Sequence, residues 1–188
     1  MSNTIYKSGD TVELINLAQN GDVKAIEALI RREQKHVYAI FSHLVSKRED
    51  ISDLTQETLL KTARNIGKLK EPKHFRQWLN RIITNVFYDY SRKKNADIAD
   101  ISEKELNEIM DKTGCEPGER CIFAEIEKLI RLALMTLPQN LRLSLILREY
   151  EGLSYEDISK ITNSTLGTVK SRISRARLKL REKLEGFI

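Results

Sequence analysis

The sequence has few of the residues that would indicate a secreted, membrane or metal-binding protein. It has two cysteines, Cys115 and Cys121, and three histidines scattered at positions 36, 43 and 74. A zinc site usually takes four closely spaced ligands, so we expect no metal, and unpaired thiols in a cytoplasmic protein. No apolar run approaches the roughly 20 residues that cross a bilayer, and the N-terminus lacks the apolar core of a signal peptide.

Turn-forming residues and catalytic motifs are also scarce. The 188 residues include eight glycines and three prolines, while apolar residues recur at spacings of three and four. That spacing is typical of helices. There is no glycine-rich nucleotide loop, no metal-spaced histidine cluster and no nucleophile motif. We therefore predict an all-α protein that takes no cofactor and is not an enzyme.

The stretch from Gly152 to Leu180 has the pattern of two helices joined by a polar turn. Ser154 is a good N-cap, and carboxylates follow it in the first turn of its helix. Residues 162–164 are polar and interrupt the apolar pattern, and Thr165 can cap the next helix. That helix has an inward stripe at spacings of four, three and four, formed by Val169, Ile173, Ala176 and Leu180. The pattern is typical of a helix-turn-helix whose second helix reads DNA.

The positive charge of the chain is concentrated in this helix-turn-helix. Between Leu153 and Lys183 there are eight basic residues and three acids, an excess equal to the whole formal net charge of +5. Such an excess on one amphipathic helix suits attraction to phosphates. A solvated surface helix would also be rich in lysine and arginine, so the charge alone leaves both interpretations open. The capped first helix and the polar turn favour DNA.

Composition changes along the chain predict two small helical domains and a linker. Residues 10–94 contain several amphipathic helices and form the first domain. Between Asn95 and Glu119 there are eight acids and two lysines, which indicates a flexible acidic linker over residues 95–120. The second domain, residues 121–184, ends in the helix-turn-helix.

A second basic surface is expected at the end of the first domain. Lys68 and Lys70 flank Leu69 in the loop before the helix that begins at Phe75, and we expect Leu69 to be exposed. Polar, basic and aromatic side chains lie around the buried stripe of that helix: Arg76, Arg81, Asn85, Tyr88, Arg92 and Lys93. Such side chains suit single-stranded nucleic acid. The alternative is that Trp78 is only core and that the lysines only increase solubility.

Four stretches together resemble the extracytoplasmic-function sigma factors, small two-domain specificity subunits of bacterial RNA polymerase. In the family's order and spacing they are DLTQETLLKTA (53–63), FRQWLNRIITNVFYDYSRKK (75–94), LPQNLRLSLILREYEGLSYEDIS (137–159) and GTVKSRISRARLKLR (167–181). The last stretch is the most specific. The resemblance implies a sigma factor that directs core polymerase to particular promoters and initiates transcription. It also implies a stress response and control by an anti-sigma factor.

The resemblance assigns the first domain to sigma region 2, which binds polymerase and melts the −10 element. The coiled coil of the largest polymerase subunit would be bound by Asp53, Gln56, Glu57 and Leu60. The −10 element would be bound by Lys68, Leu69, Lys70, Arg76, Trp78, Arg81, Asn85, Tyr88, Arg92 and Lys93. Leu69 matches a position that caps a flipped base, although the family's loop is often aromatic. Capturing such a base would offset the few kcal/mol of unstacking.

The resemblance assigns the second domain to sigma region 4, which binds the polymerase flap and the −35 element. The −35 duplex would be bound by Thr168, Lys170, Ser171, Arg172, Ser174, Arg175 and Arg177. Arginine or lysine can read guanine in the major groove, and serine can contact a base or a phosphate. Arg172 and Arg177 are expected to contact phosphates. The acidic linker would follow the basic path that the transcript later takes.

Two other functions fit parts of the sequence. A one-component transcription factor with a ligand-sensing first half would be a dimer with a closed apolar pocket and would not need the basic loop. A protein that only sequesters polymerase would not need a recognition helix.

Overall fold

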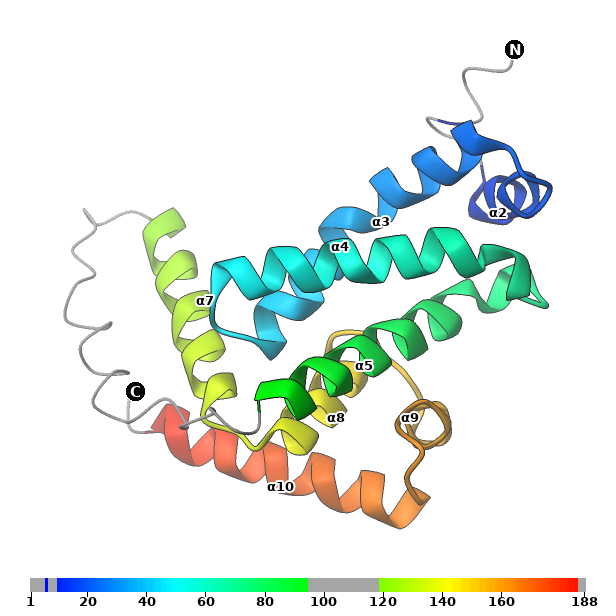
Figure 1. The fold of residues 1–188 in the computed structure, drawn as a ribbon. Coiled ribbons are helices and arrows are strands. Elements are labelled where there is room, and N and C mark those ends of the chain that lie inside the picture. The colour runs from blue at the N-terminus through cyan, green and yellow to red at the C-terminus, as the bar shows by residue number, and fades with distance from the viewer. Residues whose placement is uncertain (1–5, 7–9, 95–118, 186–188) are drawn as a thin grey trace. The chain divides into compact units, whose positions relative to one another are not determined.

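The computed structural model of the chain is built from α-helices and short 3-10 helices (Figure 1). It describes Tyr6, residues 10–94 and residues 119–185, with the backbone alone for residues 119–125. No strand occurs within these residues, so the all-α prediction is confirmed. The helices form because apolar residues at three- and four-residue spacings supply each of them with a side to bury.

The chain divides into two compact units. Unit 1 comprises residues up to 42 and 47–89, and unit 2 comprises residues 43–46 and those from 90 onward.

Among its described residues, unit 1 contains most of four helices and two 3-10 helices. They are α2 (Thr11–Gln19), α3 (Val23–Leu44), α4 (Arg48–Asn65), η1 (Ile66–Lys68), η2 (Pro72–His74) and α5 (Phe75–Lys94). Between α2 and α3 the backbone turns at Gly21, whose φ of 86° favours glycine. Asp22 caps α3, since its Oδ1 accepts a hydrogen bond from the Ala25 N–H at 3.1 Å. That bond, together with one from the Tyr6 hydroxyl, holds the pKa of Asp22 below its ordinary value.

The core of unit 1 is made by the apolar sides of its helices. Its fully buried side chains include Leu14, Ile15, Ala25, Ile40, Phe41, Leu79, Ile83, Val86 and Phe87. Helix α2 contacts both η1 and η2, so α2 supports the loop before α5. This loop, residues 66–74, is called the 66–74 loop below.

Unit 2 contains α7 (Glu119–Met135), α8 (Gln139–Glu149), α9 (Tyr155–Thr162) and α10 (Leu166–Glu185). Helix α10 contacts each of the other three helices (Figure 1). Its inward side chains join a core that includes Leu143, Leu147, Ile158, Val169, Ile173 and Ala176. The recognition helix predicted from the sequence is therefore also the helix that organises unit 2.

The predicted linker, residues 95–120, lies outside the described residues except at its end. Glu119 and Arg120 already belong to α7, so this helix begins before the expected start of the second domain at residue 121. Of the two cysteines, Cys115 lies outside the described residues and Cys121 lies in the first turns of α7.

Candidate nucleic-acid interface

The helix-turn-helix of unit 2 is held by hydrogen bonds between residues that are close together in the sequence. Ser154 Oγ accepts from the Asp157 backbone N–H at 3.0 Å and caps α9, as predicted. Asn163 follows α9 in the left-handed conformation, with φ 48° and ψ 49°, which asparagine tolerates better than most residues. Thr165 Oγ1 accepts from the Thr168 N–H at 3.1 Å and caps α10. Both helices therefore begin at side-chain caps that the sequence predicts.

The two sides of α10 have opposite characters. Val169, Ile173 and Ala176 are buried, while Leu180, the fourth residue of the predicted stripe, is only partly buried. The side chains predicted to meet the −35 element are exposed at Lys170, Ser174, Arg175 and Arg177 and partly buried at Thr168, Ser171 and Arg172. Burial of the stripe therefore orients the polar side of the helix away from the core of unit 2.

Hydrogen bonds along α10 preorganise one basic side chain. Ser171 Oγ donates to the Thr168 carbonyl at 2.9 Å and accepts from Arg175 Nη2 at 3.2 Å. The Arg175 guanidinium is thereby held beside Ser171 on the exposed side of the helix. A guanidinium has five donors, so this bond leaves donors for a guanine edge.

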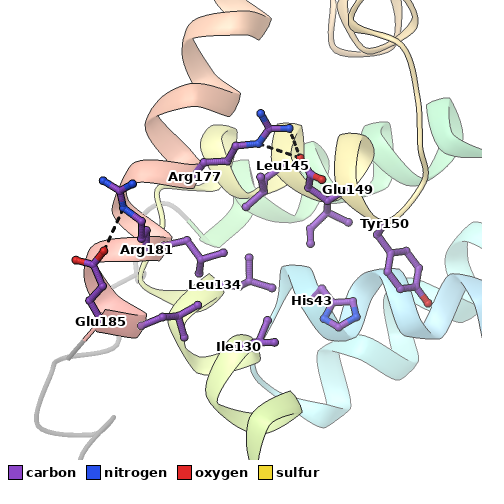
Figure 2. Close-up of a pocket in the computed structure, with 12 residues that line it drawn as sticks. His43, Ile130, Leu134, Leu145, Glu149, Tyr150, Arg177, Arg181 and Glu185 are labelled. Carbon is purple, nitrogen blue, oxygen red and sulfur yellow. Dashed lines mark hydrogen bonds and ion pairs between the residues drawn. The ribbon is translucent and has the colours of Figure 1, made fainter. Parts of the chain in front are cut away.

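The two arginines expected to contact phosphates have partners within unit 2. Arg172 Nη1 donates to Ser164 Oγ at 2.9 Å, across the turn. Arg177 Nε donates to Glu149 Oε1 of α8 at 3.0 Å (Figure 2). The hydrogen bond with Glu149 raises the pKa of Arg177. The guanidinium of Arg177 is therefore already bonded to Glu149, a partner that was not predicted from the sequence.

A shallow hollow of about 320 Å³ lies between the start of α9 and the exposed side of α10. Its polar and basic lining residues are Tyr155, Lys170, Ser174, Arg177 and Arg181. Three of the predicted −35 residues therefore border one recess, where several cations lie close enough together to attract a phosphate.

Leu69 is placed differently from the expectation. It is 6% exposed and belongs to the core of unit 1, so the prediction of an exposed Leu69 was wrong. The physical reason is that η1 ends at Lys68 and directs the next, apolar side chain inward, where burial stabilises it. Lys68 and Lys70 on either side are exposed. The exposed part of the loop is therefore basic and not apolar.

The basic character of the 66–74 loop is reduced by an acid within it. Glu71 lies 3.1 Å from Lys73 Nζ and 3.5 Å from His74 Nδ1. The hydrogen bond from Lys73, followed by the charges of Lys73 and His74, holds the pKa of Glu71 below its ordinary value. Lys68 and Lys70 therefore contribute most of the loop's uncompensated positive charge.

Of the seven predicted −10 residues of α5, five share one side of the helix, whereas Arg76 and the exposed Lys93 lie off that side. Spacings of three and four residues place five of them along one side of the helix: Trp78, Arg81, Asn85, Tyr88 and Arg92. Arg81, Asn85 and Arg92 are exposed, and the two aromatic rings are partly buried. Aromatic, amide and basic groups thus alternate along one stripe, which we call the α5 stripe.

Arg76 lies on the other side of α5 and is held by an acid from α3. Its Nη1 lies 2.8 Å from Oε2 of Glu33, and Glu33 is 2% exposed whereas Arg76 is 52% exposed. A buried carboxylate requires a compensating charge, so the pair ties the start of α5 to α3. Arg76 does not share the α5 stripe with the other predicted contacts.

The residues expected to bind polymerase form one face of α4. Asp53, Gln56, Glu57 and Leu60 are all exposed, and their spacing places them on the same side of the helix. Glu57 pairs with Lys61 at 2.7 Å, one turn along. Leu60 is unusual among the large apolar residues in being exposed.

Unit 2 also has an apolar groove beside the end of α10 (Figure 2). Its apolar walls come from α7, α8 and α10, and they include Ile130, Leu134, Leu145, Leu180 and Leu184. Ion pairs lie at its border, with Arg177 joined to Glu149 and Arg181 to Glu185. Leu180 was predicted from the sequence as part of the buried stripe and Arg177 as a −35 contact, but no groove was predicted here.

Neither a metal site nor a membrane span was found in the part of the chain that the structure describes. No group of three or more His, Cys, Asp or Glu side chains there is placed to hold a metal ion. None of its helices is long and apolar enough to cross a bilayer.

Comparisons with known families and proteins agree with this geometry. Two family models match the chain, sigma-70 region 2 over residues 29–96 and sigma-70 region 4 over residues 127–180. The extracytoplasmic-function RNA polymerase sigma-E factor of Haemophilus influenzae is 34% identical, over 92% of this chain and 94% of that protein. The RNA polymerase sigma-H factor of Pseudomonas aeruginosa is 31% identical, over 88% of this chain and 89% of that protein.

Two solved structures have the same fold. The sigma factor RpoE of Bartonella quintana, in complex with the anti-sigma factor NepR, gives a TM-score of 0.65 at 27% identity. The match covers 87% of this chain and 98% of that one. CnrH in complex with the cytosolic domain of CnrY also gives 0.65, at 21% identity, over 94% of this chain and 97% of that one.

The matches to both sigma-70 regions, together with the exposed helix-turn-helix, place the chain in the class of RNA polymerase sigma factors. Within that class, the chain belongs to the extracytoplasmic-function sigma factors. The family predicted from the four sequence stretches is therefore confirmed. Sigma factors as a class are non-enzymatic transcription initiation factors.

Proposed function

We propose that the two units act on two promoter elements. Residues 121–184 would bind the −35 element as duplex, and residues 10–94 would open the −10 element and hold its displaced strand. The observation that carries this proposal is the exposed side of α10, where Lys170, Ser174 and Arg175 lie opposite a buried stripe. A capped helix-turn-helix with this surface fits the major groove.

For the −35 element, Arg175 is the proposed base contact and Lys170 the second. Arg175 is held beside Ser171 before DNA arrives, so less of its side-chain entropy is lost on binding. Arg172 and Arg177 would reach phosphates from the two borders of this surface. Arg177 must give up or share its bond with Glu149 to do so. Its phosphate contact should therefore contribute less binding free energy than that of Arg172.

For the −10 element, the α5 stripe and the exposed lysines of the 66–74 loop would hold a single strand. Trp78 and Tyr88 offer rings for stacking, Asn85 offers an amide, and Arg81 and Arg92 attract phosphates. Lys68 and Lys70 would guide the strand towards the stripe. Because Leu69 is buried, its proposed contribution is to anchor the loop.

For polymerase, the exposed face of α4 would bind the coiled coil of the largest subunit. Asp53 and Glu57 supply carboxylates that suit arginines, and Leu60 supplies an exposed apolar side chain. The flap would be bound in the apolar groove beside α10, where the ion pairs at the border can align a helix with polar edges. Ile130→Asp should weaken holoenzyme formation, whereas Leu178→Asp, at an exposed apolar residue outside the groove, should not.

Regulation by an anti-sigma factor is part of the proposal. The chain shares its fold and 27% identity with a sigma factor solved in complex with an anti-sigma factor. We further propose that this chain acts in the cytoplasm, responds to stress and has no catalytic activity of its own, so that RNA synthesis is performed by the polymerase.

The test is run-off transcription with purified core polymerase over a pool of genomic promoters, with and without this protein. Start sites that appear only with the protein, and that share a −35 and a −10 motif, are the expected result. Duplex binding by the free protein without new start sites would overturn the proposal and favour a conventional regulator. Polymerase binding without start sites would instead favour a sequestering protein.

A further inference from the structure

The side chain of Gln19 joins α2 to the 66–74 loop. Gln19 is the last residue of α2, and its Nε2 donates to two backbone carbonyls of the loop. The acceptor at Ile66 lies 3.1 Å away and the acceptor at Leu69 lies 2.6 Å away. Ile66 is the first residue of η1, and Leu69 directly follows the end of η1. One amide group thus bridges both ends of a single turn.

The chemistry of the amide matches this position. A glutamine NH₂ has two donors, and the turn presents two acceptors to it. Within the turn itself, the described backbone bond runs from the Leu69 N–H to the Ile66 carbonyl, at 3.1 Å. A 3-10 helix of three residues has poor hydrogen-bond geometry, so its shape depends strongly on outside contacts.

Burial and hydrogen bonding fix different properties of the loop. Ile66 and Leu69 are buried, and this sets how deeply the turn is embedded in unit 1. Apolar burial is not directional, so it does not fix the orientation of the peptide groups between them. The bonds from Gln19 are directional and fix that orientation. Exposed Lys68 lies inside the bridged turn, and exposed Lys70 follows it directly.

We propose that Gln19 is a positioning residue for promoter opening. It holds the 66–69 turn in one conformation, so that Lys68 and Lys70 face the displaced strand before DNA arrives. A loop already in its bound conformation loses less entropy on binding. The inference rests on the −10 role proposed for unit 1 and adds to it a residue from α2, a helix that has no other assigned part in DNA binding.

The informative substitution is Gln19→Met, because methionine has a similar length and fills a similar volume but cannot donate a hydrogen bond. Loss of one to two net hydrogen bonds should lower the affinity of holoenzyme for a single-stranded −10 oligonucleotide about tenfold. The probe is a labelled non-template strand taken from a promoter found by run-off transcription. Asn16→Ala, at an exposed residue of the same helix, is the matched control and should leave the affinity unchanged.

Three further measurements separate positioning from simple loss of structure or of charge. The binding assay is run at a temperature where circular dichroism shows wild type and variant equally folded, and −35 duplex binding by the same samples should be equal. The salt dependence of −10 binding should also be unchanged in Gln19→Met, because both lysines remain. The ratio of affinities for cognate and base-substituted −10 strands should fall, since a loosened loop discriminates less well.

The outcomes distinguish the inference from the function on which it rests. If wild-type holoenzyme fails to bind the −10 strand, the proposed function of unit 1 is wrong, and the role of Gln19 is overturned with it. If wild type binds and Gln19→Met binds equally well with equal discrimination, only the positioning role is overturned. Equal losses on −10 and −35 probes would show a global defect and would also overturn it.

Discussion

The two caps of the helix-turn-helix in unit 2 are hydrogen bonds between near neighbours in the sequence. The 66–74 loop of unit 1 is instead bonded to a residue that is distant in the sequence. The caps at Ser154 and Thr165 each bond to a residue three positions along. In contrast, Gln19 bonds to carbonyls 47 and 50 positions away. A surface fixed by local hydrogen bonds forms when its own segment folds. A surface fixed by bonds between distant segments forms only after those segments have packed together.

The same contrast extends to the charged side chains. Arg175 of α10 is held by Ser171, four residues back in the same helix. Arg76 of α5 is held by Glu33, 43 residues earlier in α3. The proposed duplex-binding surface thus lies mainly on α10, whereas the proposed strand-opening surface combines the α5 stripe with the 66–74 loop, which α2 supports. Opening DNA demands a shaped site for an extruded base, which one helix cannot supply by itself.

The largest effect is expected from a substitution that leaves a cavity in the core beneath the proposed recognition helix, α10. Ile173→Ala removes a side chain that is 1% exposed and should lower the free energy of unfolding of unit 2 by about 2–5 kcal/mol. Hydrogen exchange of α10 amides reports it directly. Leu178→Ala, in the same helix but 49% exposed, is the control and should have little effect. Equal losses for both variants would contradict the assigned orientation of α10.

A smaller and more specific effect is expected at the proposed base contact. Arg175→Ala should weaken holoenzyme binding at one position of the −35 element by about 1–3 kcal/mol and relax the preference for the base there. Competition binding with every base pair substituted in turn measures both. An equal loss of affinity for all sequences would show that Arg175 contacts a phosphate. The proposed −35 surface on α10 would then lack its main base contact.

The long-range ion pair of unit 1 allows a test by double substitution. Arg76→Ala leaves a buried carboxylate without its cation and should destabilise unit 1 by about 1–2 kcal/mol, less than for a fully buried pair because Arg76 is half exposed. Adding Glu33→Gln should restore much of that loss, because the buried charge is then removed. Urea unfolding followed by fluorescence of the single tryptophan, Trp78, reports on this unit.

The alternative role of Arg76 is a direct contact with the −10 strand. In that case Arg76→Ala would weaken binding of the single strand without destabilising unit 1, and Glu33→Gln would restore nothing. That outcome would move Arg76 to the DNA surface that the family resemblance assigns to it.

The contrast between the units also explains what could be predicted from the sequence. The helix-turn-helix was predicted with its caps and most of its buried stripe, because each of those signals lies within a few residues of the feature it controls. Leu69 was misplaced for the opposite reason. Its neighbours are lysines, so the local pattern indicates an exposed loop, and only the packing of α2 against η1 shows that the side chain is buried.

The partners Gln19, Glu33 and Glu149 were missed on the same grounds. A polar residue on an amphipathic helix usually faces solvent, and nothing in the local pattern of α2 or α3 marks these side chains as exceptions. Glu149 pairs with Arg177, 28 residues later, through the packing of α8 against α10. Contacts of this kind depend on how helices pack, and periodicity within one helix carries no information about that.

The smallest effect is expected from removing a local cap of the helix-turn-helix. Ser154→Ala removes the hydrogen bond that Ser154 Oγ accepts from the Asp157 N–H and the one that it donates to Asp157 Oδ2, and should lower the stability of α9 by about 1 kcal/mol. Ser52→Ala is the control, since Ser52 lies inside α4 and its hydroxyl only donates back to the Arg48 carbonyl. Hydrogen exchange of the first α9 amides should rise about fivefold, with −10 strand binding unchanged. An unchanged α9 would mean that packing against α8 and α10, and not its cap, sets the start of the helix, and the two surfaces would then both depend on distant contacts.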